Sequence, residues 1–460
     1  MAVTSLNEVI VDSSALNERL LAQLKDAVGR TMSARSLSEK LGHSHNYVRR
    51  IFSREIPLQV STLLEMLTQL GMPPRSFFDQ VLEGLPAIDP VAVLRFYRQG
   101  NGLPLDPFLD EVGPRVRALV DRPVDTDAAV ESWRGELDQL EKLRFEDRDG
   151  TKLRLESIIR EILAQVDSLE ERVPSQHLAD LALAGATWAT IMRTKGLHDN
   201  CCDMYILALG PGIRSDDAWV LGSTLQRASY LLRDLDAAEA GLKFLTVAQD
   251  LFTQKGDLLK LGQVLLDRGI LLSHLGKEFA AFRLFDASLR LLPQSATQLR
   301  AAAFSEMAFN CQERDELARA HEYICEARKL YRPGSTDHVY AHILATEARI
   351  ARKLGFHAEA ETAFKTAISA YDRGGNPGYV AFVALDLAGL YLEQGRTLEL
   401  ASLADDMFGV LKILRSNRMM DAVLMEFIRT AKWGELTEKF LADAKERLEG
   451  AAHWHQKKAS

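Results

Sequence analysis

The feature of this chain that most constrains its fold is an internal repeat with a period of about 40 residues, which lies within the range of helical repeat proteins. The series is formed by four alanines at nearly equal spacing and continues at a fifth position: Ala240, Ala281, Ala320, Ala360 and then Leu400 or Ala401. A unit of this length cannot bury its own apolar face, so such units must stack on one another. The period therefore predicts a solenoid with one continuous core.

Each repeat carries the same arrangement of small and bulky side chains. A bulky apolar residue follows the alanine by four positions: Phe244, Phe285, Ile324 and Phe364. A small residue or valine comes three positions later: Val247, Ser288, Ala327 and Ala367. Another small residue precedes the alanine by twelve positions: Ala228, Gly269, Ala308 and Ala348. This spacing places each set on one helix face and predicts two closely packed helices per repeat.

The pattern is similar to the tetratricopeptide repeat (TPR), with small residues at its eighth and twentieth positions, an aromatic residue at its twenty-fourth and a proline at its end. Pro293 and Pro333 end two of the pairs. The resemblance covers about residues 178–414, although the period is near 40 rather than about 34 residues. It implies an all-α fold with a TPR-like α-solenoid, wound as a right-handed superhelix over residues 178–450. Helix pairs near 178–209 and 419–449 would cap the stack, and residues 451–460 would form a flexible tail. Another α-solenoid of helix hairpins is the alternative.

The composition agrees with a nearly all-helical chain. Aromatic residues make up only 7% of the 460 residues, and Ala, Leu and Glu recur at helical spacing with hardly any alternating strand pattern. Six of the fourteen prolines fall between residues 86 and 123, which predicts a connector with short helices over residues 86–125. Linking helices are predicted near 127–142 and 153–171, in a segment spanning residues 126–177.

Residues 1–85 read as a separate small module of five short helices, predicted over 19–29, 34–41, 45–52, 61–70 and 74–81. Ser33 and Ser44 occupy predicted N-cap positions, and Gly42 supplies the turn between the second and third helices. The inward positions of these two helices are apolar: Leu37, Leu41, Val48 and Ile51. The pattern predicts a core of three helices with an exposed third helix.

This module resembles the phage-repressor, or XRE, type of helix-turn-helix domain. The similarity extends over about sixty residues and includes the run SARSLSEKLGHSHNYVRRIFSR at positions 33–54 and a later helix that ends at Leu70-Gly71. Such domains place the third helix in the DNA major groove. The resemblance implies base contacts from Ser44, His45, Asn46 and Arg50 of this chain. It implies phosphate contacts from Arg35, Arg49 and Arg54.

The chemistry of these residues suits double-stranded DNA. Asn pairs with adenine, Arg pairs with guanine, and six basic residues between positions 30 and 54 face a single acidic one. The whole chain has a net charge of -8, so any DNA contact must be local. Ala34 and the Phe52-Ser53-Arg54 ending depart from the family pattern. A degenerate domain that makes only protein contacts is therefore the alternative.

Other function classes find no support in the sequence. There is no P-loop, no dinucleotide-binding glycine motif and no nucleophile elbow in a strand context, so we expect no enzyme and no cofactor. The four cysteines form no CxxC pair, and no metal site is expected. No apolar run is long enough to span a membrane, and no leader is recognisable, which predicts a cytoplasmic protein.

An XRE-type domain followed by TPRs is similar in layout to the peptide-responsive RRNPP regulators. That resemblance implies a homodimeric transcriptional regulator whose repeats hold a peptide or protein segment on their concave face. Polar residues predicted to line that face and to be free for a ligand are Arg233, Gln263, His274, Gln312, Glu313, His342, Arg349, Arg352 and Lys353. An ordinary polar surface is the alternative for these residues. A TPR adaptor for protein partners, carrying a degenerate helix-turn-helix, is the alternative for the whole chain.

Overall fold

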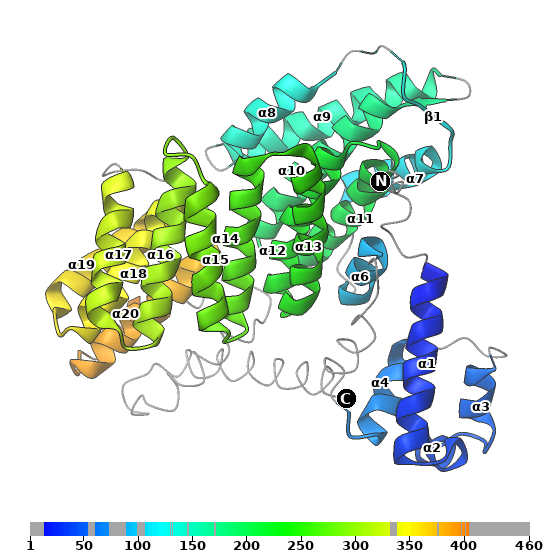
Figure 1. Ribbon diagram of the computed structural model, residues 1–460, viewed down its shortest axis with the longest axis horizontal. Helices are drawn as coiled ribbons and strands as arrows, with labels where there is room; N and C mark the ends of the chain where they lie inside the picture. The colour runs from blue at the N-terminus through cyan, green and yellow to red at the C-terminus, as the bar shows by residue number, and fades with distance from the viewer. Residues whose placement is uncertain are drawn as a thin grey trace. The chain divides into compact units, whose positions relative to one another are not determined.

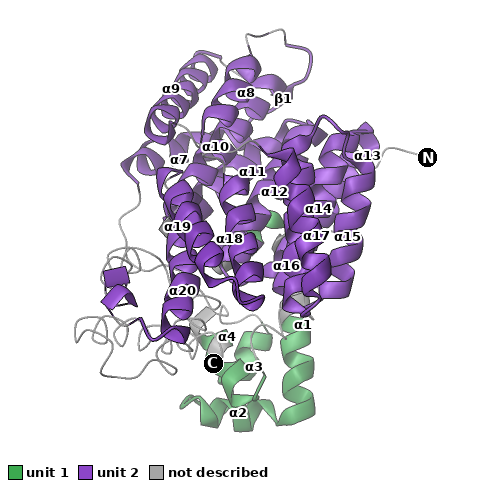
Figure 2. Cartoon of the chain, turned by 90° about the vertical axis from the view of Figure 1, so that its left-hand side faces the viewer, with its two compact units in different colours: residues 1–92, 445–460 green, residues 93–444 purple. Residues whose placement is uncertain are grey.

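The computed structural model describes residues 13–53, 60–72, 89–98, 106–128, 130, 132–144, 147–169, 172–331, 338–374, 377–396, 398–400 and 402–403. The chain divides into two compact units (Figure 2). One unit comprises residues 1–92 with 445–460, and the other comprises residues 93–444. Helix α6 (Pro90–Tyr97) includes residues of both ranges.

The described part of the N-terminal unit begins with four helices: α1 (Ser13–Thr31), α2 (Ala34–Lys40), α3 (Tyr47–Phe52) and α4 (Val60–Gln69). Their shared core is apolar and fully or almost fully buried: Leu24, Val28, Leu37, Val48, Ile51, Leu63, Met66 and Leu67. The hydroxyl of Ser33 caps α2 by accepting from the Ser36 amide, and Gly42 turns the chain with φ of 72°. Both assignments agree with the sequence prediction, whereas Leu41 is only half-buried. The predicted helix over 74–81 lies outside the described residues.

Helix α3 begins two residues later than the sequence predicts. The amide of Tyr47 donates to the carbonyl of Ser44, which closes a four-residue turn before the helix. The N-cap is therefore Asn46 and not Ser44, and the Asn46 side chain makes no capping hydrogen bond. His43 stacks on Tyr47 with ring centroids 3.8 Å apart, which favours this turn over a longer helix. Ser44, His45 and Asn46 consequently lie before α3.

The second unit continues with three helices that precede the repeats: α7 (Pro107–Val120), α8 (Arg134–Leu143) and α9 (Arg148–Asp167). The carboxylate of Asp147 caps α9 by accepting from the Gly150 amide. Two short segments, β1 (Val124–Asp125) and β2 (Val173–Pro174), pair in parallel. Among the described residues, no helix is both long and apolar enough to cross a membrane.

In the part of the chain that the structure describes, the repeat region consists of five helix pairs and one further helix, which form an α-solenoid (Figure 1). The first helices of successive pairs are α10 (Ser175–Thr194), α12 (Ala218–Asp234), α14 (Leu258–His274), α16 (Thr297–Glu313) and α18 (His338–Lys353), followed by α20 (Pro377–Glu393). The second helices are α11 (His198–Arg214), α13 (Ala238–Lys255), α15 (Glu278–Leu291), α17 (Leu317–Leu330) and α19 (His357–Arg373). The predicted terminal pair near 419–449 lies outside the described residues.

The small and bulky residues of the repeat lie in the core as the sequence predicts. The four alanines Ala240, Ala281, Ala320 and Ala360 belong to second helices and are buried. Gly269 on α14 shows why the opposing position must be small, because a Cβ there would overlap the ring of Phe285 on α15. Val247 is the exception, because it is only half-buried and its neighbour Ala248 is fully buried instead. Close approach within each pair therefore determines the repeat.

The two sets of helices form an inner and an outer layer. Each first helix contacts the first helices of the neighbouring pairs, whereas successive second helices approach one another less closely. A stack that is tighter on one side curves toward that side. We call α10, α12, α14, α16, α18 and α20 the inner layer.

A glycine substitution tests whether close approach within a pair limits stability. We expect Gly269→Ala to lower the free energy of unfolding by about 1 to 3 kcal/mol, because the added methyl group must displace the Phe285 ring. Gly135→Ala is the matched control, since a Cβ at that position on α8 has open space around it. The control should gain about 0.5 to 1 kcal/mol. Urea unfolding of both variants measures the difference, and an equal response would contradict this account.

Candidate functional site

The outward surface around α3 is the candidate DNA-binding site of the N-terminal unit. Helical geometry of about 100° per residue turns Arg49 and Arg50 away from the buried Val48 and Ile51. The side chains of the predicted base and phosphate contacts are exposed where the structure describes them: Arg35, Ser44, His45, Asn46, Arg49 and Arg50. Arg54 lies outside the described residues.

A buried hydroxyl sets the position of α3 against α2. Ser38 lies on α2, and its Oγ accepts a hydrogen bond from the Val48 amide at 3.1 Å. The same Oγ donates to the carbonyl oxygen of Ala34 at 2.8 Å. Ser38 has no exposed surface, so water cannot replace either bond. This contact fixes the angle at which the exposed side of α3 is presented.

One carboxylate interrupts the positive charge on this surface. Glu39 accepts from Nε of Arg35 at 3.3 Å and lies 2.9 Å from Nδ1 of His45. All three side chains are well exposed, so each pairing is weak and DNA phosphates can compete for Arg35. The structure thus brings Arg35 and His45 together through Glu39.

The residues predicted to bind a ligand all lie on helices of the inner layer, but the prediction that they are free is wrong for most of them. Five of them pair with side chains that lie about one repeat away along the chain. These pairs are His274–Asp236 at 3.9 Å, His342–Glu306 at 3.1 Å, Arg349–Asp386 at 2.6 Å, Arg352–Glu393 at 2.5 Å and Lys353–Asp315 at 2.7 Å. Their main observed role is to join neighbouring pairs, and their binding of a ligand stays a prediction.

Three further predicted residues are also engaged with their neighbours. Nζ of Lys353 donates to the carbonyl of Gln312 at 2.8 Å, and the Gln312 side chain is buried. Gln263 accepts from Lys260 at 3.5 Å. Arg233 pairs with Asp234 at 3.1 Å. The exposed members of the predicted set are Glu313 and Lys353, and the others are buried or half-buried.

A buried carboxyl group joins α12 to α14 within the inner layer. Asp267 accepts from Nε2 of Gln226 at 2.6 Å and from the hydroxyl of Tyr230. Burial raises the pKa of Asp267 to about 6, although both hydrogen bonds and the charge of Lys260 oppose the shift. The carboxyl group is therefore mostly ionised at pH 7 and gains its proton in mildly acidic solution.

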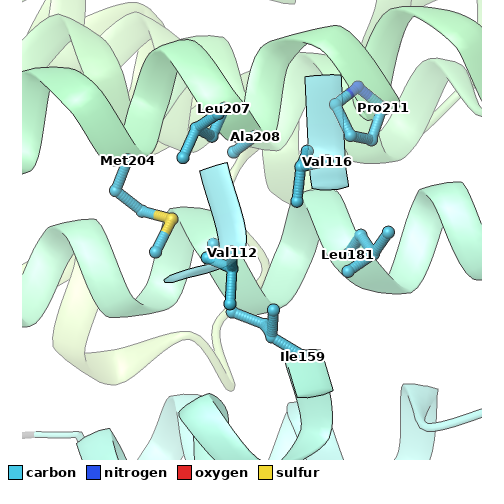
Figure 3. A pocket seen from close by; sticks show the side chains of 9 residues that line it. Val112, Val116, Ile159, Leu181, Met204, Leu207, Ala208 and Pro211 are labelled. Carbon is cyan, nitrogen blue, oxygen red and sulfur yellow. The ribbon is translucent and has the colours of Figure 1, made fainter. Parts of the chain in front are cut away.

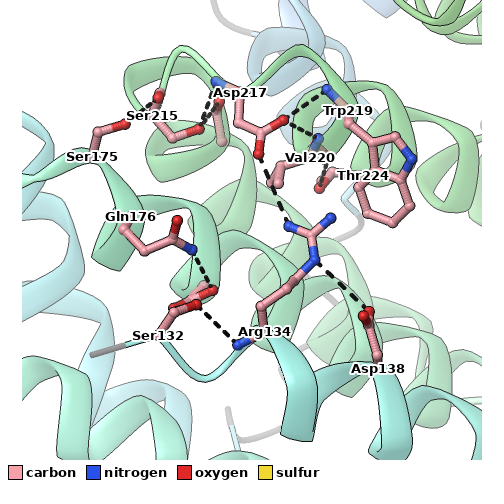
Figure 4. Close-up of polar contacts among 12 residues, drawn as sticks. Ser132, Arg134, Asp138, Ser175, Gln176, Ser215, Asp217, Trp219, Val220 and Thr224 are labelled. Carbon is pink, nitrogen blue, oxygen red and sulfur yellow. Dashed lines mark hydrogen bonds and ion pairs between the residues drawn. The ribbon is translucent and has the colours of Figure 1, made fainter. Parts of the chain in front are cut away.

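Polar contacts at the N-terminal ends of three helices join the linking helices to the repeats (Figure 4). The guanidinium of Arg134 lies 4.3 Å from the centre of the Trp219 ring and 3.9 Å from Asp217, which caps α12. Asp180 on α10 accepts from the Trp133 amide at 3.0 Å, and burial raises the pKa of Asp180. These contacts hold the start of α8 against α10 and α12 of the repeats.

A small apolar cavity lies among α7, α9, α10 and α11 (Figure 3). Its volume is about 10 Å³, which is about the space that one water molecule requires. Its lining is apolar: Val112, Val116, Ile159, Leu181, Gly185, Met204, Leu207, Ala208 and Pro211. The cavity is too small and too apolar for a ligand site.

The adjacent cysteines on α11 are poor candidates for a redox sensor. Cys201 and Cys202 are fully buried. Burial raises the pKa of the Cys201 thiol well above its ordinary value, so the reactive thiolate is disfavoured. Packing explains both residues.

One cluster of charged and aromatic residues was not predicted from the sequence. Arg233 on α12 donates to the hydroxyl of Tyr379 on α20 at 3.0 Å, across 146 residues of chain. Arg148 on α9 donates to the carbonyl of Gly374, which follows α19. Arg193 and Arg233 lie one repeat apart and occupy equivalent places near the ends of α10 and α12. Arg233 was predicted from the sequence as a ligand-facing residue, but its contacts with Tyr379 and Asp234 were not. The shared repeat position of Arg193 and Arg233 was the further sequence signal for the cluster.

Comparisons with known proteins agree with the repeat fold. No protein-family model and no curated protein sequence matches the chain. Among solved structures, a Rap protein complexed with competence and sporulation factor is similar at a TM-score of 0.51 and 13% identity, covering 75% of this chain and 94% of the other. A signal transduction ATPase (STAND) with a tetratricopeptide repeat sensor from Pyrococcus horikoshii has a TM-score of 0.42 and 12% identity, covering 97% of this chain and 65% of the other. The stacked helix pairs and the likeness to the Rap protein show a TPR-like fold.

Removing the Ser38 hydroxyl tests whether it holds α3 in place. We expect Ser38→Ala to destabilise the α2–α3 contact by about 1 to 3 kcal/mol, because the Val48 amide is left buried without an acceptor. Amide exchange in peptides covering residues 44–52 of the full chain should accelerate about tenfold or more. Ser36→Ala is the control on the same helix and should leave exchange unchanged. Equal exchange in both variants would refute this role.

Proposed function

We propose that the chain is a sequence-specific, DNA-binding transcriptional regulator whose repeats dimerise and sense a peptide or protein segment. The observation that carries the proposal is the exposed, basic surface around α3, next to a buried contact that fixes its orientation. A helix presented in this way fits the DNA major groove. The proposal includes a cytoplasmic location and no catalytic step.

The residues of this surface divide into two kinds of DNA contact. We assign base contacts to Asn46 and Arg50, with Ser44 and His45 at the same edge of the groove. Arg35, Arg49 and Arg54 are assigned to phosphates, which contribute affinity that is independent of sequence. The exposure of both Arg49 and Arg50 is consistent with this division.

The sensing role is supported by the repeat fold and by its neighbour. The Rap protein with a similar fold was solved in complex with competence and sporulation factor. In the present chain a ligand on the inner layer must compete with ion pairs between repeats, such as Arg349–Asp386. A ligand that replaces such pairs changes how neighbouring repeats pack, and it can thereby favour one DNA-binding state.

A protein-binding adaptor with a degenerate helix-turn-helix is the second candidate. The observation that favours it is the short α3 of six residues, beside a carboxylate that pairs with both Arg35 and His45. The adaptor has no need of DNA. Retention of the full-length protein on DNA, and its loss with added salt, separates the two candidates.

Substitutions on α3 test the DNA-binding role. Target sequences are first selected from random DNA with the full-length protein, and affinities are then measured by fluorescence anisotropy. We expect Arg50→Ala to cost about 1 to 3 kcal/mol and to relax preference at one base pair. Arg35→Ala should weaken binding to all sequences alike, because a phosphate contact carries no sequence information.

Arg290→Ala is the control for these substitutions, since Arg290 is an exposed arginine on the repeat helix α15 that pairs with Asp286. It should leave DNA affinity unchanged. If Arg50→Ala alters neither affinity nor selectivity, α3 is not the recognition helix.

The proposal also predicts a homodimer. A single helix-turn-helix offers a small interface, and two copies can span half-sites about one helical turn apart. We expect sedimentation velocity at micromolar concentration to give twice the 51.3 kDa mass of the chain, with the repeats as the dimer surface. A monomer both in isolation and on DNA would exclude this arrangement.

A further inference from the structure

Two arginines near the ends of α10 and α12 share a single carboxylate. Nη1 of Arg193 lies 2.6 Å from Oδ2 of Asp234, and Nη2 of Arg233 lies 3.1 Å from Oδ1. Burial alone would raise the pKa of Asp234, but the charges of Arg193 and Arg233 lower it to about 2. The carboxylate is therefore ionised, and it neutralises only one of the two guanidinium groups.

A third arginine adds to this positive charge. Burial, together with the charge of Arg193, lowers the pKa of Arg148 to about 10, so Arg148 remains a cation at neutral pH. Asp149 also acts on Arg148, but it is paired with Lys195 at 2.5 Å. The four cations and two carboxylates named here leave two positive charges. We call Arg148, Arg193 and Arg233 the arginine cluster.

The aromatic residues beside the arginine cluster also feel the charge of Glu306, which acts on Tyr371 and lies 3.1 Å from Nε2 of His342. Burial lowers the pKa of His338 to about 3, so its ring is neutral. Tyr371 and Tyr379 stack with centroids 5.1 Å apart, and His338 packs edge-on against Tyr379 at 4.5 Å. The dipoles at the C-terminal ends of α10 and α12 offset part of the excess charge. A net positive charge remains beside the rings of His338, Tyr371 and Tyr379.

Solvent still reaches this site, and donors remain available there. The side chains of Arg193, Arg233 and Asp234 keep 13%, 17% and 19% of their surface exposed. Within the described residues, only Asp234 accepts a hydrogen bond from the guanidinium of Arg193. A guanidinium has five N–H donors and binds carboxylates in a two-pronged geometry. Arg193 can therefore accept a second carboxylate without losing the first.

We propose that the arginine cluster binds a carboxylate of a peptide ligand, with the free C-terminal carboxylate as the group recognised. The inference rests on the proposed sensing function and specifies its chemistry. A carboxylate at Arg193 and Arg233 neutralises the excess charge and lies beside Tyr379, which belongs to the other end of the described stack. One bound anion thereby lies between α12 and α20 of the described stack.

Peptides with and without the C-terminal charge test this assignment. The probe is a random hexapeptide library made once with free carboxylates and once as C-terminal amides. Each form is incubated with the full-length protein, and the retained peptides are measured by mass spectrometry. We expect the wild-type protein to retain the free acids at least tenfold over the amides. In Arg193→Gln and Arg233→Gln the ratio should fall to about one.

Two further variants separate a binding role from a structural one. Arg328→Gln removes a similar ion-paired arginine from α17, where it contacts Glu347 at 2.6 Å, and should keep the wild-type ratio. Asp234→Asn removes a negative charge next to the site, so it should strengthen anion binding by about tenfold. A merely structural cluster predicts the opposite, since loss of Asp234 leaves the arginines repelling one another. Equal retention of acids and amides, or weaker binding in Asp234→Asn, would overturn the proposal.

Inorganic phosphate distinguishes failure of this inference from failure of the proposed function. At constant ionic strength, phosphate should raise the melting temperature of the wild-type protein in a saturable way, and Arg193→Gln should abolish the effect. Stabilisation by phosphate without retention of any peptide would refute peptide sensing and this assignment, while leaving an anion site. Retention of peptides with no acid preference would refute the arginine cluster alone.

Discussion

The architecture of this chain depends on the close approach of two helices within each pair. Gly269 leaves room for the Phe285 ring, and the equivalent positions Ala228, Ala308 and Ala348 are equally buried. Because the short side chain lies on the first helix and the bulky one on the second, each pair locks in a single register. The tight stacking of first helices on their neighbours follows from that register. It places their polar residues side by side in the inner layer.

Ion pairs one repeat apart are the second level of organisation. Arg349, Arg352 and Lys353 on α18 each pair with a carboxylate on a neighbouring repeat. Arg193 pairs in the same way with the carboxylate of Asp234. Breaking a partly buried pair leaves a charge without compensation, which costs more than the intact pair contributes. The inner layer is thus a charged surface that is already largely satisfied internally. A ligand there has to replace internal pairs, except where, as we propose for the arginine cluster, the internal charge balance is incomplete.

The sequence predicted what depends on local spacing and missed what depends on folding at a distance. The buried alanines and the Ser33 cap were predictable, because helix periodicity and capping act within a few residues. The pairing of Arg349 with Asp386 was not, since it depends on how far α18 is rotated against α20. The start of α3 was misplaced by two residues, because the Tyr47 amide bonds to the Ser44 carbonyl and places Ser44 in a turn before the helix. Tyr379 gave no local signal for its contact with Arg233.

A solenoid in which each unit touches only its neighbours behaves as a one-dimensional chain, which can fray from either end. The hydrogen bond between Arg233 on α12 and Tyr379 on α20 joins positions 146 residues apart. It therefore closes a long loop of chain within the described stack. Closing that loop costs chain entropy. We therefore expect the Arg233–Tyr379 contact to form after the individual helix pairs. Once closed, it ties the melting of α20 to that of α12. Within the described stack, α12 and α20 then share a direct contact in addition to the repeats between them, so a description by nearest neighbours alone is incomplete for these two helices.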